Sequence, residues 1–322
     1  MEHDPTSYLA FSRKLYDIRT AQPTSTGPFS PLRLSTGTVH PFYIYGTAFQ
    51  EDRTGELKAL ALKNGFRGVD SANYSSAYEE PSIRSTKRKA PRPHGRNIDK
   101  WGKLHLHPGT TKFTPIWAHA ESKLPYNADQ PLENQVHESI EQSFQNLKLG
   151  YIDALLLHAP FEDEQDDTVA WHAMESLVPP RVGVLGVSNS GRAALEKLYA
   201  AASVKPKIAQ NRFQEENEYD ADIREYLDKT GIVYQAFSLL KANQEIRSSE
   251  LVARVAERFY TEREIAFYML VLGLGKVSIV NGTTSEAREM DLSRLQSFWE
   301  TNRPRLALTE HLAEFKQLLR TK

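Results

Sequence analysis

The sequence predicts an α/β fold, a single closed (β/α)8 barrel of the TIM-barrel class. Short runs of apolar and β-branched residues recur along the chain, and segments with helical periodicity separate them. The length of 322 residues suits one such barrel. The run that ends at Tyr45 continues as Gly46-Thr47-Ala48-Phe49, without the glycine-rich phosphate turn of an open dinucleotide-binding sheet. A doubly wound open sheet is therefore disfavoured.

The expected elements alternate along the chain. Buried strands are expected at 42–45, 65–70, 151–158, 182–189, 208–213, 232–237 and 277–280, and a further strand is expected to end near Lys112. Helices are expected at 54–63, 132–149, 168–177, 191–202, 220–229 and 262–272. Strands joined through helices by short connections run parallel, so their carboxyl ends meet at one mouth of the barrel.

Residues 1–31 are expected to form an N-terminal extension, and residues 32–322 the barrel. The extension ends in a stretch rich in Pro, Ser, Thr and Gly at 22–31, with one short helix expected at 8–18. Net charge is -1, cysteine is absent, and no apolar run is long enough to cross a bilayer. We therefore expect a cytoplasmic monomer that acts on a small molecule, with no nucleic-acid or membrane partner.

Residues 81–109 form an atypical segment of the expected barrel. The segment is strongly basic, and Pro91 and Pro93 interrupt it where a helix should cover the barrel. Pro108-Gly109 stands where a central strand should run. Either a sequence or splicing error or a tolerated surface insertion would explain the sequence of this segment. We expect the segment to be the least ordered part of the barrel and the protein to be weakly active or unstable. If the covering helix is missing, Lys112 is expected to lie out of register with Asp70. A nucleic-acid patch is disfavoured, because aromatic residues do not accompany the charge.

Polar residues end the expected strands, where a barrel carries its chemistry. Asp70, Lys112 and His158 end three successive strands, and Ser188-Asn189 and Gln210 follow on the next two. A carbonyl group that accepts a hydride needs a proton donor at its oxygen. A tyrosine serves when a neighbouring cation lowers its pKa. Lys112 would supply that cation, Asp70 would hold Lys112, and His158 would donate a hydrogen bond that orients the carbonyl.

The same stretches carry a family resemblance. They are Gly46-Thr47-Ala48, 65–72, 111–115, 151–158, 184–189 and 282–286. Together they resemble the aldo-keto reductase family, most of all its fungal members, over residues 32–295 with a gap at 81–109. The resemblance implies an NADPH-dependent reductase of aldehydes or ketones, of the kind that fungi use in secondary metabolism or in sugar and aldehyde reduction.

The resemblance implies four catalytic residues: Asp70, Lys112, His158 and a tyrosine. Many members place that tyrosine five residues after the aspartate, where this chain has Ser75. The fungal branch has a longer loop and places it eight residues after, at Tyr78. We therefore choose Tyr78 and keep Tyr74 as the alternative.

The resemblance also implies a cofactor site. The matching positions are Ser188, Asn189 and Gln210 for the nicotinamide amide, Phe237 for stacking on the nicotinamide ring, and Thr283 and Thr284 for a phosphate at a helix N-terminus. NADPH is the expected cofactor, with Arg288 as partner of its 2′-phosphate. NADH stays open, because Val280 and Glu286 stand where NADPH-selective members carry basic residues.

Two other functions compete with the reductase. One is a catalytically impaired barrel that keeps the fold and the cofactor pocket. The other is a metal-dependent barrel hydrolase, which needs His and Asp clustered at strand ends. His105 and His107 have a suitable spacing but precede their strand, and His119 and His172 show no ligand spacing. No metal site is therefore expected.

Overall fold

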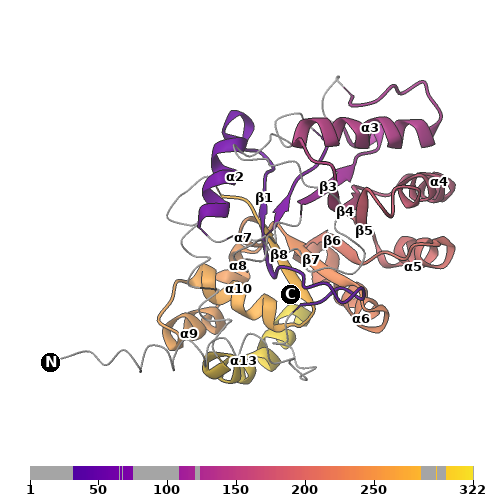
Figure 1. Ribbon diagram of the computed structural model, residues 1–322. Coiled ribbons are helices and arrows are strands. Elements are labelled where there is room, and N and C mark those ends of the chain that lie inside the picture. Colours follow the sequence, from indigo (N-terminus) through magenta and orange to yellow (C-terminus); the bar gives the residue numbers. More distant parts are fainter. Residues whose placement is uncertain are drawn as a thin grey trace, which may run out of the picture.

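The expected barrel is confirmed in the computed structural model, which describes residues 32–64, 66, 68–74, 109–119, 124–283, 295 and 302–321. Eight parallel strands close in sequence order, and Figure 1 shows the helices around them. The strands are β1 (Tyr43–Gly46), β2 (Val69–Asp70), β3 (Gly109–Phe113), β4 (Ile152–Leu157), β5 (Val182–Ser188), β6 (Ile208–Arg212), β7 (Val233–Phe237) and β8 (Val277–Asn281). β8 pairs with β1 and completes the ring.

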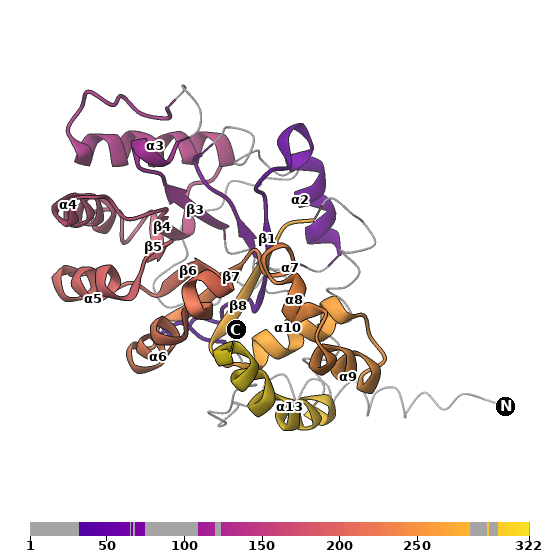
Figure 2. The same ribbon diagram turned by 180° about the vertical axis from the view of Figure 1, so that it is seen from behind.

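The helices form the outer layer (Figure 2). They are α2 (Thr54–Lys63), α3 (Leu132–Leu147), α4 (Glu164–Glu175), α5 (Arg192–Ala201), α6 (Ala221–Thr230), α7 (Leu239–Ala242), α8 (Gln244–Arg247), α9 (Glu250–Arg258), α10 (Arg263–Gly273) and α13 (Asn302–Thr321). Short 3-10 turns cover Glu51–Arg53, Ile116–Ala118 and Glu215–Asp220. The helix expected at 54–63 has the observed bounds, while the expected helix at 8–18 lies outside the described residues.

One expected boundary was wrong for a clear reason. The helix expected to begin at residue 168 begins at Glu164 instead, as α4. Asp163 caps the helix by accepting a hydrogen bond from the backbone N–H of Gln165. Acidic side chains in the first turn also suit the positive end of the helix dipole. The acidic residues before position 168 therefore form the first turn of the helix.

Strand β3 corrects a second expectation. Lys112 was expected to lie out of register with Asp70, yet Asp70 pairs with Thr110 and the parallel ladder from β2 to β4 is regular. The strand begins at Gly109, whose backbone N–H donates to Asp153 Oδ2 at 2.9 Å. Pro108 therefore precedes the described strand and does not interrupt it, and β3 carries Lys112 to the mouth of the barrel.

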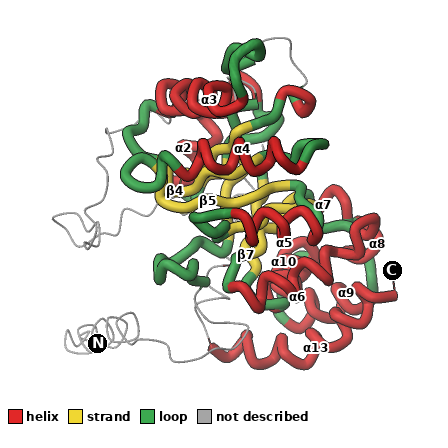
Figure 3. Tube along the Cα trace, turned by 90° about the vertical axis from the view of Figure 1, so that its right-hand side faces the viewer, coloured by secondary structure: helices red, strands yellow, loops and turns green. Residues whose placement is uncertain are grey.

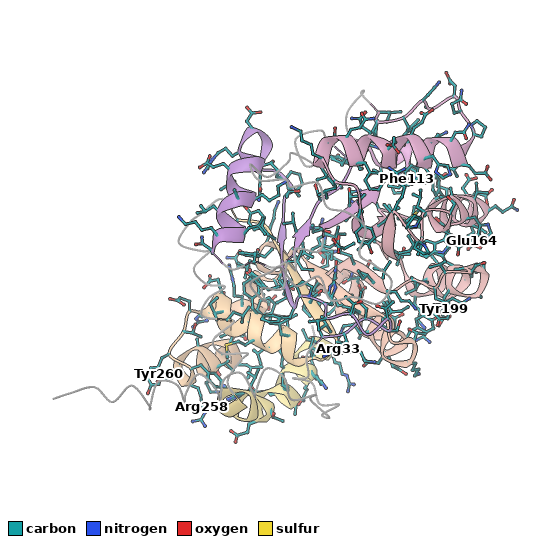
Figure 4. The ribbon with its side chains drawn as sticks, viewed as in Figure 1. Arg33, Phe113, Glu164, Tyr199, Arg258 and Tyr260 are labelled. Carbon is teal, nitrogen blue, oxygen red and sulfur yellow. The ribbon has the colours of Figure 1, made fainter. Side chains whose placement is uncertain are left out.

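The core has two parts, inside and outside the ring of strands, and Figure 3 shows the strands enclosed by helices. The outer part packs strands against helices; Phe113, labelled in Figure 4 beside α3, belongs to it. The inner part joins Leu34 to Ala154, Leu156, Val184, Ile208 and Val233. Leu34 lies in a small hairpin bridged at Arg33 and Val39, which precedes β1. The hairpin therefore fills the amino-terminal end of the barrel, and the functional site is at the other end.

Candidate active site

A pocket of about 660 Å³ lies at the carboxyl ends of the strands. Among the predicted site residues it is lined by Asp70, Lys112, His158, Ser188, Asn189, Gln210 and Phe237. Thr283 is buried beside it, next to the lining residue Gly282. Tyr78, Thr284 and Arg288 lie outside the described residues. The structure thus brings together eight of the eleven predicted positions, from β2 to β8.

Asp70 and Lys112 form a buried ion pair. Lys112 Nζ lies 2.7 Å from Asp70 Oδ2 and also donates to the backbone oxygen of Ser71 at 2.7 Å. The two side chains are only 10% and 5% exposed, so each charge needs the other to offset its lost hydration. Asp70 ends β2 and Lys112 is the next-to-last residue of β3, the adjacent parallel strand, which is why the pair forms at the mouth. The ammonium group is held by two oxygens at the floor of the pocket.

The second carboxylate oxygen of Asp70 also has a fixed partner. Gln210 Nε2 donates to Asp70 Oδ1 at 2.8 Å and to Gln235 Oε1 at 2.8 Å. Sequence reasoning placed Gln210 at the nicotinamide and did not single out Gln235. The only signal for Gln235 was a polar amide inside an otherwise apolar strand.

His158 is half-buried and neutral. Burial, with the positive charge of Lys112 and the neighbouring His119 in second and third place, lowers the pKa of His158 to about 3. Its Nδ1 lies 2.7 Å from the hydroxyl of Thr114, which follows β3. A neutral imidazole that accepts from Thr114 through Nδ1 carries its proton on Nε2. His158 is therefore suited to donate a hydrogen bond and unsuited to act as a strong acid.

Tyr74 lies beside His158 in the pocket lining. Its ring stacks on His119 at a centroid distance of 5.8 Å and meets His158 edge-on at 6.2 Å. His119 Nε2 lies 3.1 Å from the backbone oxygen of Thr114. Sequence reasoning assigned no role to His119, but these contacts place it in an aromatic wall next to His158.

The Phe237 wall of the pocket carries three basic residues that sequence reasoning missed. The guanidinium of Arg212 lies 5.3 Å from the centre of the Phe237 ring, and it also donates to Ser238 Oγ. Lys241 on α7 and Arg247 on α8 line the same pocket. Asp70 is the only acidic residue among the described lining residues, and Lys112 neutralises it. The pocket is therefore suited to an anionic ligand.

Two glycines allow β1 and the end of β8 to approach closely. A Cβ atom on Gly282 would lie 2.7 Å from the backbone oxygen of Gly46, closer than real Cβ contacts allow. Both glycines line the pocket. Tyr45 donates its hydroxyl to the backbone oxygen of Thr283 at 2.9 Å, which fixes the chain just past β8. This rim exposes backbone to the pocket, as a phosphate site requires.

The hydrolase alternative finds no support in the described residues. Within the ranges that the structure covers, no group of three His, Asp or Glu side chains could hold a metal ion. In that same part of the chain, none of the helices combines the length and the apolar character needed to cross a membrane.

Comparisons with known proteins agree with this geometry. The model of the Aldo/keto reductase family matches residues 33–245. Glyoxal reductase of Bacillus subtilis (strain 168) is 28% identical over 231 residues, which cover 70% of this chain and 73% of that protein. Glycerol 2-dehydrogenase (NADP(+)) of Hypocrea jecorina is 27% identical over 283 residues, covering 77% and 81%.

Two solved structures resemble the fold. An aldo-keto reductase from a Medee basin deep-sea metagenome library has a TM-score of 0.68 at 19% identity, covering 90% of this chain and 95% of its own. An aldo/keto reductase from Brucella melitensis has a TM-score of 0.64 at 21% identity, covering 87% and 98%. At such identities the likeness supports the barrel fold alone.

Proposed function

The chain belongs to the aldo/keto reductase family, and from this premise we propose that it reduces aldehyde or ketone groups with NADPH, with Tyr78 as proton donor. The enzyme class, an NAD(P)H-dependent oxidoreductase, is that of the family. One observation carries the proposal: the buried Asp70–Lys112 ion pair and the neutral His158 line a single pocket.

The residues around the pocket fit a nicotinamide cofactor. Ser188 and Gln210 offer hydrogen-bonding groups for its carboxamide, and Phe237 offers an aromatic face. Lys241, Arg247 and the glycine rim suit its phosphates. When bound, the reduced nicotinamide supplies the hydride. The Hypocrea jecorina relative is named for NADP(+), which supports NADPH as the preferred form.

The protein's own residues would handle the substrate oxygen. His158 donates a hydrogen bond from Nε2 and orients the carbonyl group. Because burial lowers the pKa of His158 to about 3, the proton that completes reduction must come from another group. A tyrosine hydroxyl next to the Lys112 ammonium meets this need. Tyr78 is our choice, and Tyr74, which lies in edge-on contact with His158, is the alternative.

The relatives indicate small carbonyl substrates. The Bacillus subtilis relative is named for glyoxal and the Hypocrea jecorina relative for glycerol, both small and polar. We propose short aldehydes and ketones as the first substrates to test. The sequence resemblance to fungal enzymes adds secondary metabolism as a proposed setting.

The test follows NADPH oxidation with a panel of such aldehydes. We expect turnover by the full chain, and we expect His158→Ala and Tyr78→Phe each to lower kcat by orders of magnitude with NADPH affinity nearly unchanged. Full activity of Tyr78→Phe together with inactive Tyr74→Phe would transfer the acid role to Tyr74. NADPH binding without turnover on any substrate would establish the impaired barrel in place of the reductase.

Cofactor preference has its own test. An arginine paired with the 2′-phosphate contributes about 1.5–3 kcal/mol, so Arg288→Ala should raise the KM for NADPH about tenfold or more and leave that for NADH unchanged. A KM for NADH below that for NADPH in the unmodified protein would reject NADPH as the preferred cofactor.

The domain boundaries are also proposals. We propose that residues 32–322 form the barrel and that residues 1–31 are an extension without a catalytic part. The described barrel elements run from Tyr43 to Thr321, which supports this division. A chain that begins at residue 32 should keep the kcat of the full chain, and a large loss of turnover would show that the extension contributes to the site.

A further inference from the structure

A chain of buried polar side chains crosses the inside of the barrel. It starts at Lys112 and Asp70 at the pocket floor and continues through Gln210 to Gln235. Gln235 Nε2 then lies 2.9 Å from Nε2 of His40, just before β1. All five residues are buried, with whole-residue exposures between 0% and 7%. The contacts therefore link the catalytic end of the barrel to its amino-terminal half.

The direction of these hydrogen bonds is fixed by Asp70. A carboxylate only accepts, so the amide nitrogen of Gln210 must face it. That nitrogen also donates to Gln235 Oε1, which turns the Gln235 nitrogen towards His40. His40 must then accept through an unprotonated Nε2. Burial lowers the pKa of His40 to about 4, so the ring is neutral near pH 7 and can do so.

Apolar packing would not require such a chain. The inner layer nearer the amino-terminal end is apolar and includes Val233, two residues before Gln235 on β7. A fully buried amide costs free energy unless its groups are paired, and a methionine of similar length would fill the same space. The amide of Gln235 is satisfied at both ends by Gln210 and His40. The role of Gln235 therefore lies in the position of its hydrogen-bond partner Gln210.

We propose that Gln235 is a positioning residue which, with His40 behind it, holds Gln210 against Asp70 and thereby fixes the Lys112 ammonium for catalysis. The proposal rests on the reductase function proposed above. It also sets the orientation of Gln210. Both hydrogens of its amide nitrogen are committed to Asp70 and Gln235, so its oxygen is the group left to accept from the carboxamide nitrogen of the cofactor.

The kinetic test replaces Gln235 by methionine, which keeps the length and removes both hydrogen bonds. We expect Gln235→Met to lower kcat at least about tenfold, since small misplacements of catalytic groups have effects of this size. The matched control is Tyr234→Phe on the same strand, which removes a buried hydrogen bond to Asp220 Oδ2 on the helix side of β7. Its kcat should stay near that of the unmodified protein. Equal kcat values for the two variants would overturn the proposal.

The spectroscopic test does not depend on activity. With ¹⁵N-labelled histidine, and the His40 signals assigned from a His40→Gln variant, Nε2 of His40 should show an unprotonated, hydrogen-bonded nitrogen. Asp70→Asn removes the carboxylate that accepts from Gln210 and so sets the direction of all these hydrogen bonds. The Nε2 signal of His40 should therefore shift, although Gln235 is unchanged. Tyr234→Phe should leave it in place.

The two tests separate the possible failures. If the unmodified protein reduces no carbonyl but the His40 signal responds to Asp70→Asn, the reductase function is refuted and the series of hydrogen bonds from Asp70 to His40 is supported. If the protein is active but the His40 signal does not respond to Asp70→Asn, the proposed hydrogen-bonded link between Asp70 and His40 is refuted. Should Gln235→Met not fold, the response to Asp70→Asn still decides whether His40 and Asp70 are linked.

Discussion

The hydroxyl of Thr114 lies 2.7 Å from Nδ1 of His158. We infer that the Thr114 hydroxyl donates to Nδ1 in this contact. A neutral ring that accepts from Thr114 through Nδ1 is protonated on Nε2, and Nε2 is then the donor left for a ligand in the pocket. Thr114 is fully buried directly after β3, so the same strand that carries Lys112 also places this hydroxyl against the ring of His158.

Thr114→Val should lower kcat about tenfold and leave the Kd for NADPH unchanged. Valine has the shape of threonine but no hydroxyl, so the ring of His158 loses the contact that selects its tautomer. Steady-state kinetics and cofactor fluorescence titration measure the two constants. Thr114→Ser keeps a hydroxyl and should restore most of the activity. Equal kcat values for the valine and serine variants would remove Thr114 from the mechanism.

Stability should fall in mild acid because desolvation keeps His40 and His158 neutral in the folded protein. Burial lowers the pKa of His40 to about 4 and that of His158 to about 3, from an ordinary value of 6.5. As pH falls below 6.5, the unfolded chain binds protons that the folded chain does not, so folding free energy is lost. The loss continues until about pH 4 for His40 and about pH 3 for His158, and it is absent above about pH 7.

Urea unfolding at pH 7 and pH 4.5 measures this effect. Between these two pH values, His40 alone should account for ~2 kcal/mol of the decrease in unfolding free energy. His40→Gln should therefore show a smaller decrease than the unmodified protein. His172→Gln, on the exposed side of α4, should show the full decrease. Equal decreases in all three proteins would show that His40 is not the group responsible.

Limited proteolysis tests the expectation for the atypical segment, most of which lies outside the described residues. The first cleavages by trypsin should fall between Arg84 and Lys103, because the prolines in this sequence prevent the expected amphipathic helix. Proteinase K, which does not depend on basic residues, should cut the same region first and so controls for its many lysines and arginines. Resistance to both proteases, together with turnover typical of the family, would contradict the expectation.

The fold was predictable because local patterns repeat. Buried strands appear as short apolar runs, and the helices that cover them have an apolar stripe. Boundaries such as those of α2 could therefore be predicted from the sequence. The acidic start of α4 was missed because carboxylates suit both a loop and a helix N-terminus. Helices α9 and α13 were also not predicted, although Leu251, Val252 and Val255 form a buried face on α9.

The site was predictable only where one residue ends one strand. Asp70, Lys112 and His158 are of this kind, and parallel pairing brought them together. Thr114 and Gln235 act through contacts between neighbouring strands, with residues that lie 44 and 25 positions away in the chain. Such contacts leave no local pattern, so only the closed ring of strands reveals them.

Gly282 should not tolerate a side chain, because its Cβ would lie 2.7 Å from the backbone oxygen of Gly46. Backbone cannot give way as a flexible side chain can, so Gly282→Ala should push β1 and the end of β8 apart. We expect a loss of about 1–3 kcal/mol in unfolding free energy.

The same displacement should weaken cofactor binding, because both glycines line the pocket. We expect the Kd for NADPH to rise at least about tenfold in Gly282→Ala. The matched control is Gly191→Ala at the start of α5, where nothing lies within 4 Å of an added Cβ and φ is -72°. Denaturant unfolding and fluorescence titration compare the two variants. If Gly282→Ala matches Gly191→Ala in both stability and Kd, the contact between Gly46 and Gly282 does not shape the cofactor site.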